Sequence, residues 1–408
     1  MSLDNLAIVA AVAFAAPLLL GFAPGLRAPS VLIEILAGVV LGPSVLDWVQ
    51  ADTAVEVLAL IGVGFLLLLA GIEIDFDQLR GRLLSVALAG FVVSFAIALA
   101  VSFGLSAAGV VSSPFLIAVI LSATSLAVVL PLLKDSGLIE SRFGQVVIAG
   151  ASIADVATVL LLSLFFSGES TALESRLVLF GVFGLLCVLV TALVAAGGRL
   201  SRLSGVLFRL QDTTAQIRVR GTFLLLLVFS IVAQRFGLEA ILGTFLAGAI
   251  LKLADRDGMM THSHFHAKLE EAGFGFFIPV FFVSSGIKFD GHALFADGST
   301  LAKVPIFLLA LYLIRGLPAL LYRPLIGNRL TIAAGVLQAT TLSFVLIASQ
   351  IGVQLGLITA AISAALTAAA LLSVLINPVV ALTLLRTPSE PGEEFPPTGG
   401  NAAGVLQP

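Results

Sequence analysis

The chain has 408 residues, of which 59% are hydrophobic and only 11% charged, and its formal net charge is −3. Soluble globular domains carry roughly 25% charged residues, so this composition excludes a water-soluble enzyme. The acidic balance also excludes a basic nucleic-acid binder, so we expect no nucleic-acid partner. A mean hydropathy of +1.15 instead predicts an all-α polytopic membrane protein, whose main surroundings are the lipid bilayer.

Thirteen apolar segments follow one another along the chain and predict about 13 transmembrane helices. They cover residues 5–22, 30–46, 54–73, 83–107, 114–133, 143–166, 177–196, 221–236, 238–252, 272–288, 303–322, 330–351 and 357–385. With this number of spans, 16 of the 21 Lys and Arg residues fall on one side of the membrane and 4 on the other. Because basic residues favour the cytoplasmic side, the N-terminus is predicted outside and the C-terminus in the cytoplasm of a cell (inner) membrane protein.

These segments predict one transmembrane domain over residues 1–386. Residues 387–408 are rich in Pro, Gly and Glu and contain few apolar residues. Such a composition cannot bury enough apolar surface to fold, so it predicts a disordered cytoplasmic tail.

Three short patterns occur twice in the same order. They are LAG at 36–38 and 246–248, GIEID at 71–75 and GIKFD at 286–290, and ATSL at 123–126 and ATTL at 339–342. Each pair is seven predicted spans apart, so the two copies must cross the membrane in opposite directions. The sequence therefore predicts inverted repeats over approximately 30–166 and 238–385, as in secondary transporters whose sites lie on discontinuous helices.

Hydroxyl residues interrupt the fifth and twelfth spans at matching places. Thr124 and Ser125 interrupt the fifth span, and Gln338, Thr340 and Thr341 occupy the corresponding part of the twelfth. An unwound turn with hydroxyl and carbonyl oxygens suits a hard monovalent cation. Alternatively, these side chains only cap or bend ordinary helices.

Asp155 lies deep in the sixth span. A carboxylate near the bilayer centre costs at least about 2.5 kcal/mol, so it indicates an ion or proton pathway unless it is a paired structural charge. Ser152 and Thr158, at i−3 and i+3, share its side of the helix and are predicted to complete an oxygen cage.

Other charged residues also lie within or near the predicted spans. Arg315 is the only basic residue well inside a span. We expect it to balance Asp155 or the negative C-terminal ends of broken half-helices, although a purely structural charge is the alternative. Glu34 and Glu73 lie near span ends and are candidates for access funnels, with interfacial solvation as the alternative.

Enzyme motifs are absent from the sequence. It contains no Gly-Lys-Ser/Thr phosphate loop and no His-Glu-x-x-His. Its single cysteine, Cys187, excludes disulfides and cysteine-rich metal sites. We therefore expect neither enzymatic activity nor a cofactor, and no resident metal.

Several of these motifs resemble the monovalent cation:proton antiporter-2 family, which includes Kef-type potassium/proton antiporters and sodium/proton exchangers of the same fold. The resemblance lies in residues 29–44, 65–79 and 279–286 and extends over 5–385. It implies the sodium/proton antiporter fold, in which the broken fifth and twelfth spans cross near the site. It also implies a homodimer in which a core bundle slides against a dimerisation domain, an elevator motion.

The same resemblance implies residue roles. Asp155 matches the family's shared cation- and proton-binding aspartate, Arg315 its core basic residue, and Thr124 and Ser125 the broken-helix turn. The preceding residue is Ala154, where these families usually have Asp, Asn or Gln, and this difference favours electroneutral exchange. The chain also ends without the nucleotide-binding regulatory domain of Kef-type members.

The sequence thus predicts a secondary active antiporter that exchanges Na⁺ or K⁺ for protons at Asp155. Three alternatives remain open at this point. They are a gated cation channel, a transport-dead sensor of the same fold, and a sodium-coupled organic-anion symporter in which Arg315 faces the substrate.

Overall fold

The computed structural model describes residues 3–22, 30–73, 81–139, 141–166, 216–236, 238–254 and 263–386, with isolated helical positions between 178 and 189. The predicted tail at 387–408 and nearly all of the seventh predicted span lie outside these residues. Within them the chain is helical and contains no strand. Eight helical stretches of this part are at least 18 residues long and apolar enough to cross a membrane.

Helices overlie twelve of the thirteen predicted segments. They are α1 Asp4–Phe22, α2 Ser30–Leu41, α3 Thr53–Glu73, α4 Gly81–Ala107, α5 Pro114–Leu121, α6 Leu126–Asp135, α7 Arg142–Phe166, α10 Ile217–Arg235, α11 Ala240–Ala254, α12 Ser263–Ala272, η1 Gly273–Phe277, α13 Ile278–Ile287, α14 Gly291–Phe295, α15 Gly298–Leu311, η2 Tyr312–Gly316, η3 Leu317–Tyr322, α16 Arg323–Gln338, α17 Ser343–Gln354 and α18 Ala360–Arg386.

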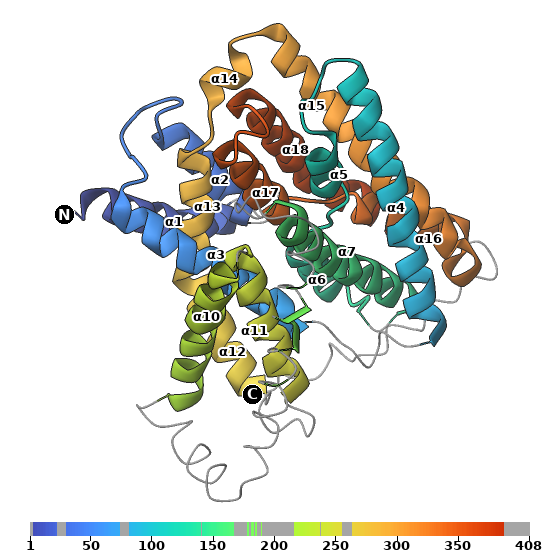
Figure 1. Ribbon diagram of the computed structural model, residues 1–408, viewed down its shortest axis with the longest axis horizontal. Helices are drawn as coiled ribbons and strands as arrows, with labels where there is room; N and C mark the ends of the chain where they lie inside the picture. Colours follow the sequence, from blue (N-terminus) through green and yellow to red (C-terminus); the bar gives the residue numbers. More distant parts are fainter. Residues whose placement is uncertain are drawn as a thin grey trace, which may run out of the picture.

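The helices form two groups that pack mainly within themselves. The first contains α1–α3 and α10–α13, and the second contains α4–α7 and α15–α18 with η2 and η3. In Figure 1, α1, α2, α3 and α13 lie to one side of the molecule and α4, α15 and α16 to the other. Contacts between the groups include those of α7 with α11 and of α2 with α18.

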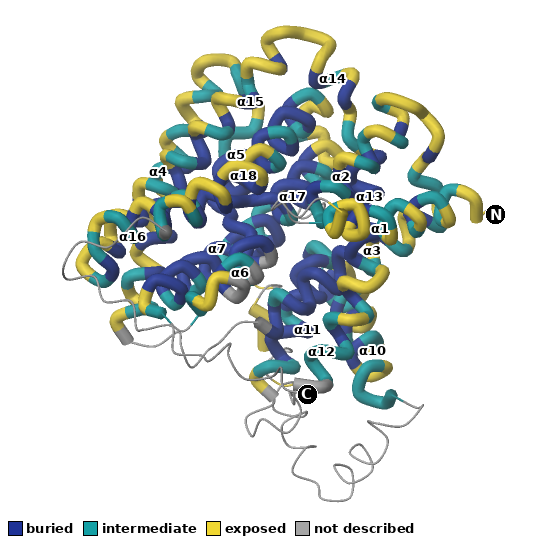
Figure 2. Tube along the Cα trace, turned by 180° about the vertical axis from the view of Figure 1, so that it is seen from behind, coloured by how far each residue is buried: buried dark blue, intermediate teal, exposed yellow. Residues whose placement is uncertain are grey.

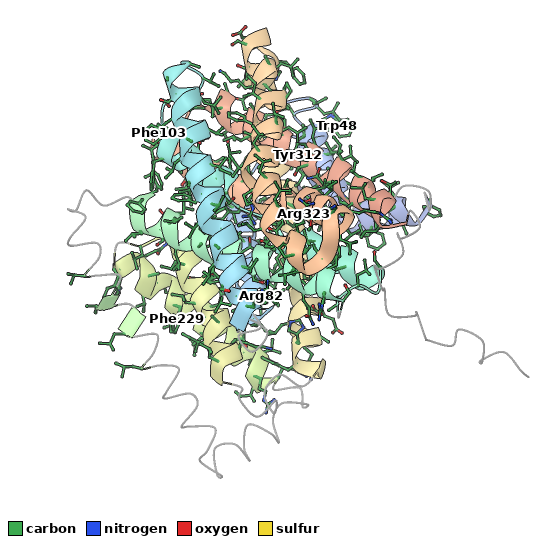
Figure 3. All side chains as sticks on the ribbon, turned by 90° about the vertical axis from the view of Figure 1, so that its right-hand side faces the viewer. Trp48, Arg82, Phe103, Phe229, Tyr312 and Arg323 are labelled. Carbon is green, nitrogen blue, oxygen red and sulfur yellow. The ribbon has the colours of Figure 1, made fainter. Side chains whose placement is uncertain are left out.

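Burial follows this arrangement. Figure 2 shows α7 and α17 buried in the interior, while α4, α15 and α16 carry exposed positions along their outer sides. Large apolar side chains such as Phe14, Val92 and Leu224 are more than 60% exposed. In α4, exposed side chains lie near both ends, with Arg82 near one and Phe103 near the other (Figure 3). An apolar outer surface of this kind is stable against lipid hydrocarbon rather than water.

Two helix crossings in the first group rest on pairs of glycines. A Cβ on Gly38 of α2 would lie 2.2 Å from the Val283 carbonyl oxygen and 3.0 Å from the Gly286 Cα of α13. A Cβ on Gly71 of α3 would lie 3.1 Å from the Gly248 Cα of α11. Gly38 corresponds to Gly248 in the sequence repeat, and Gly71 to Gly286. Each crossing therefore pairs one copy with the other in a reciprocal way.

Both predicted helix breaks occur. Residues 122–125 separate α5 from α6, and residues 339–342 separate α16 from α17. α5 begins at Pro114, a residue whose fixed φ suits the first helical turn. The backbone N–H of Ser125 donates to the Thr340 carbonyl at 2.8 Å, so the two breaks meet directly. The prediction of two broken helices that cross is confirmed.

Candidate functional site

Arg315 ties four segments of the second helix group together. Its Nε donates to the Thr124 hydroxyl at 2.8 Å and its Nη1 to the Ser94 hydroxyl at 3.2 Å. Its Nη2 donates to the Gln338 side-chain oxygen and, at 3.4 Å, to the Gly150 carbonyl. The side chain is only 4% exposed. Four of its five N–H groups therefore have acceptors among the described residues, which offsets most of the cost of burying a guanidinium.

The local chain around Arg315 departs from α-helical geometry. η2 is a π-helical turn and η3 a 3₁₀ turn, and Pro318 lies at the start of η3. Proline has no N–H, so it cannot pair with the carbonyl of Ile314, four residues earlier. The Ser94 hydroxyl donates to that carbonyl at 2.7 Å and also accepts from Arg315. Irregular helical turns of this kind are frequent at functional sites.

The guanidinium lies where two half-helices end. Gln338 is the last residue of α16, and Thr124 follows α5 by three residues. The Thr124 hydroxyl also donates to the Gln338 carbonyl at 2.6 Å. Helix C-termini carry partial negative charge, so a cation here is stabilised. This geometry is the one expected from the role in balancing half-helix ends.

Gly150 and Gln338 form the wall beside Arg315. The Gln338 Nε2 donates to the Val147 carbonyl of α7 at 3.0 Å. A Cβ on Gly150 would lie 2.3 Å from that Nε2 and 2.7 Å from the Tyr322 hydroxyl. A Cβ at position 150 would therefore force the Gln338 and Tyr322 side chains to shift and would disturb the hydrogen bonds of Gln338.

Asp155 lies on α7 at the opposite end of the first break. Its Oδ2 accepts from the backbone N–H of Leu126, the first residue of α6, at 3.4 Å. The N-terminus of a helix carries partial positive charge and favours an anion. Each helix end thus faces a side chain of opposite charge. The Asp155 carboxylate lies at the positive N-terminus of α6, and the Arg315 guanidinium lies at the negative C-termini of α5 and α16.

A small cavity of about 40 Å³ opens beside Asp155, in the seam between the two helix groups. Thr124, Ser125 and Asp155 supply polar atoms to its wall, as does Ser343 at the start of α17. The rest is apolar and comes mainly from α3, α11, η1 and α17: Leu66, Leu67, Leu69, Ala70, Leu126, Val159, Phe245, Phe274, Phe344 and Ile347. The Ser125 hydroxyl is buried and has no hydrogen-bond partner in the described part of the chain.

Ser152 and Thr158 are on α7 as expected, but neither lines this cavity. The Thr158 hydroxyl donates to the carbonyls of Ala154 at 2.7 Å and Asp155 at 3.2 Å, within its own helix. Back-bonding of this kind is common for threonine in helices. A spacing of three residues also rotates a side chain by about 60° from Asp155, enough to turn it out of the cavity.

The second break makes its contacts with neighbouring segments mainly through backbone atoms rather than side chains. The Thr340 carbonyl accepts from Ser125, as described above. The Thr341 N–H donates to the Ser373 hydroxyl at 3.2 Å, and that hydroxyl donates back to the Thr341 carbonyl at 3.1 Å. Thr340, Thr341 and Gln338 do not line the cavity. They stabilise the crossing of the two broken helices.

Of the two predicted funnel residues, Glu34 is 3% exposed on α2 and does not line the cavity beside Asp155. Glu73 ends α3, and its side chain lies outside the described part.

Sequence reasoning named Thr124 and Gln338 but missed the other two partners of Arg315, Ser94 and Gly150. Ser94 is one of several serines in an apolar helix, and Gly150 is one of 39 glycines. Neither has a neighbouring motif that distinguishes it. Ser343, which lines the cavity, belongs to the same polar run as Gln338, Thr340 and Thr341 and is therefore marked by the repeat.

Comparisons with known proteins agree with this geometry. The model of the family described as "Sodium/hydrogen exchanger, transmembrane" matches residues 10–387. The chain belongs to this family. Over 370 residues it is 34% identical to the putative Na⁺/H⁺ antiporter YjbQ of Bacillus subtilis strain 168, covering 86% of this chain and 58% of that protein. It is also 31% identical over 283 residues to cation/H⁺ antiporter 18 of Arabidopsis thaliana, covering 64% of this chain and 34% of that one.

A solved structure shares the fold. The sodium proton antiporter MjNhaP1 of Methanocaldococcus jannaschii superposes with a TM-score of 0.67 at 17% identity. The match covers 94% of this chain and 99% of that one. The chain thus has the fold of this exchanger, and it is a multi-pass membrane protein.

Proposed function

We propose that the protein is a secondary active antiporter that exchanges a monovalent cation, Na⁺ or K⁺, for protons, with Asp155 as the shared site. One observation carries this proposal. The Asp155 carboxylate and the Ser125 hydroxyl, which has no hydrogen-bond partner among the described residues, line the same small cavity in the seam between the two helix groups. The printed names of the relatives, which include Na⁺/H⁺ and cation/H⁺ antiporters, support it.

The chemistry is a competition for one carboxylate. Oxygen atoms from Asp155, Ser125 and Thr124 suit an alkali cation, and about 40 Å³ leaves room for an ion with only a few waters. A proton on Asp155 removes the negative charge that the cation needs. Cation binding therefore requires proton departure, and proton binding releases the cation.

The residue before Asp155 supports electroneutral, one-for-one exchange. Ala154 is completely buried and has no titratable group. One carboxylate that alternates between a proton and a monovalent cation carries the same net charge in both loaded states.

The arrangement of the helices supports alternating access by an elevator motion. The cavity lies between α3, α11 and η1, which packs against the first group, and the first break, α6, α7 and α17 of the second group. Sliding of the second group, which Arg315 holds together, would carry Asp155 from one side of the membrane to the other.

Several finer points belong to the same proposal. The protein would work as a homodimer in the cell (inner) membrane, with its N-terminus outside and its C-terminus in the cytoplasm. Its inverted repeats would cover 30–166 and 238–385, which the reciprocal glycine crossings support. It would need no cofactor and no covalent chemistry, because ion gradients supply the driving force.

The contacts of Arg315 argue against the organic-anion symporter. Each of its three side-chain nitrogens already donates to a protein acceptor, and Arg315 does not line the cavity. A substrate carboxylate would have to displace these bonds.

Proteoliposomes with an internal pH dye test the proposal. Pulses of Na⁺, K⁺ or Li⁺ should change the internal pH with the wild-type protein and not with Asp155→Asn. A cation flux in Asp155→Asn that needs no opposing proton would favour a channel. The absence of any pH response across pH 6 to 9 would overturn the antiporter.

A further inference from the structure

A second cavity lies in the seam between the two helix groups, away from Asp155. Its volume is about 200 Å³, and it is bounded by the end of α13, by α17 and by the first turns of α18. Since a water molecule takes about 30 Å³ in the liquid, this space holds several waters. It is large enough for a monovalent cation with its first water shell, whereas the cavity at Asp155 is not.

Hydroxyl and amide groups line this second cavity. Ser285 of α13 and Thr367 of α18 are 4% and 5% exposed, and both face the cavity. Their hydroxyls make no hydrogen bond to another described residue. Gln350 and Ser363 add further polar atoms. Polar side chains on the wall of a cavity this large can bond to water or to a ligand, so we expect the cavity to be hydrated.

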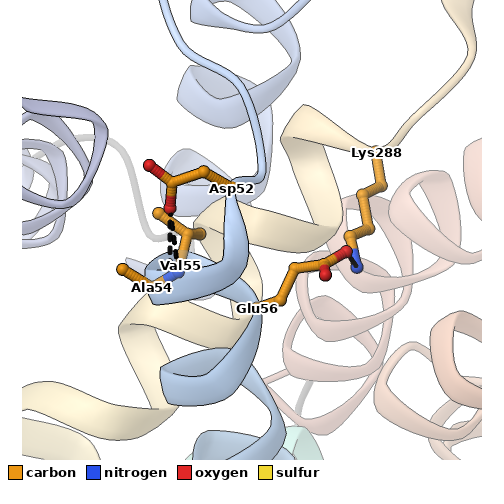
Figure 4. A network of polar contacts seen from close by, with 5 residues as sticks. All are labelled: Asp52, Ala54, Val55, Glu56 and Lys288. Atoms are coloured by element: carbon orange, nitrogen blue, oxygen red, sulfur yellow. Dashed lines mark hydrogen bonds and ion pairs between the residues drawn. The ribbon is translucent and has the colours of Figure 1, made fainter. Parts of the chain in front are cut away.

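The charges around the cavity favour a cation. Lys288 lies on its wall, but the Lys288 ammonium is 2.9 Å from the Glu56 carboxylate of α3 (Figure 4). Asp290 also lines the cavity. The formal charge of these three side chains is therefore −1. Both α13 and α17 end here, at Ile287 and Gln354, with their negative C-termini, while α18 begins here with its positive end, as does the short α14, whose N-terminus the Asp290 carboxylate caps.

One helix separates the second cavity from the first. Leu346 of α17 lines the second cavity, and its neighbour Ile347 lines the first. The helices of the walls also correspond in the sequence repeat. α3 and α7 flank the first cavity, and α13 and α18 flank the second.

We propose that this second cavity binds a hydrated monovalent cation, as a site separate from Asp155 on the other side of α17. Its neutral oxygens replace outer hydration rather than the inner shell, so Na⁺, K⁺ and Rb⁺ bind with similar affinity. Cation transfer from this site to Asp155 rests on the proposed antiport, but cation binding in the cavity does not.

Anomalous diffraction from crystals soaked in Rb⁺ or Tl⁺ tests the site. We expect a peak between Ser285 and Thr367 in the wild type and in Asp155→Asn. Gln350→Lys places a second ammonium in the cavity and should abolish the peak, whereas Gln350→Met, similar in size and uncharged, should retain it. Gln354→Lys, at the exposed end of α17, applies the same charge if Gln350→Lys does not fold.

The outcomes separate this inference from the proposed function. A peak in the second cavity with none at Asp155 supports the second site and counts against the shared carboxylate. Water alone in the second cavity of the wild type overturns the inference. In transport assays, Gln350→Lys should raise the half-saturating cation concentration about threefold or more from one side of the membrane only. Equal effects from both sides would also contradict it.

Discussion

Arg315 and Thr124 lie 191 positions apart in the chain, yet the guanidinium Nε donates to the threonine hydroxyl at 2.8 Å. The same hydroxyl donates to the Gln338 carbonyl at 2.6 Å and so connects Arg315 to the second broken helix. Through these two hydrogen bonds, the guanidinium of Arg315 stabilises both helix breaks. The cavity beside Asp155 depends on the first of them.

Removal of the guanidinium should disrupt the core of the second helix group. Arg315→Gln leaves the Thr124 and Ser94 hydroxyls without their donor, so we expect a loss of about 3 kcal/mol in stability. Arg315→Lys keeps the charge but cannot reach all four acceptors, and its loss should be intermediate. Thermal unfolding in detergent measures this. Arg323→Gln, at an exposed position (Figure 3), is the control. Equal stability of Arg315→Gln and Arg323→Gln would contradict the role assigned to Arg315.

The two hydroxyls at the first break should have different effects. Thr124→Val loses hydrogen bonds to Arg315 and Gln338, so it should lower stability by about 1–3 kcal/mol. Ser125→Ala removes a hydroxyl that has no partner in the described residues, so its stability should be unchanged. Because the Ser125 hydroxyl is proposed to bind the cation, the apparent affinity of Ser125→Ala for Na⁺ or K⁺ should fall about tenfold. Stability curves and cation titrations of both variants distinguish these roles, and the reverse pattern would refute them.

The glycine crossings predict a sharp contrast among Gly→Ala substitutions. Gly38→Ala would place a methyl group 2.2 Å from the Val283 carbonyl oxygen. The contact is with the backbone of α13, which can move only if the whole helix shifts. We expect this variant to fail to fold or to lose several kcal/mol. Gly104→Ala, on α4, meets nothing within 4 Å and should be neutral or slightly stabilising. Expression and size-exclusion profiles compare the two, and similar profiles would count against the close crossing.

Asp52 should make the stability of α3 depend on pH. Its carboxylate accepts from the N–H groups of Val55 and Ala54, both at 3.0 Å, and from the Asn5 side chain (Figure 4 shows the first two). The backbone bond from Val55, followed by the bond from Asn5, lowers the pKa of Asp52 below its ordinary value. Its contribution is therefore present above about pH 4 and is lost as the pH falls through the lowered pKa.

Asp52→Ala should accordingly melt at a lower temperature than the wild type at pH 7. The difference should shrink below about pH 4, where the wild-type carboxyl also becomes protonated. Glu56→Gln, on the same helix, is a control that keeps the Asp52 carboxylate, which caps the N-terminus of α3. A difference that is constant from pH 3 to 7 would show that the cap does not act through its charge.

The sequence predicted those parts of the fold that depend on the residues of one short segment. Hydropathy located the spans, and the polar runs at 122–125 and 338–341 located the two breaks. The repeat aligned Gly38 with Gly248 before any contact between helices was known.

Residues that act across the chain were harder to predict. Ser94 looks like any serine in an apolar helix until Pro318, far along the chain, leaves the Ile314 carbonyl without its helical donor. Likewise, helical spacing placed Ser152 and Thr158 near Asp155, but it could not show that Thr158 bonds to its own helix. Side-chain direction depends on neighbours that the sequence does not bring together.

Proton release on cation binding tests the central claim most directly. Purified protein in weak buffer, with a pH indicator, is titrated with Na⁺ or K⁺ near the pH at which Asp155 is half protonated. If one carboxylate holds either ion, the wild type should release protons as it binds the cation, approaching about one per cation at lower pH, and Asp155→Asn should release none. Cation binding without proton release in the wild type, or equal release from Asp155→Asn, would contradict the shared site.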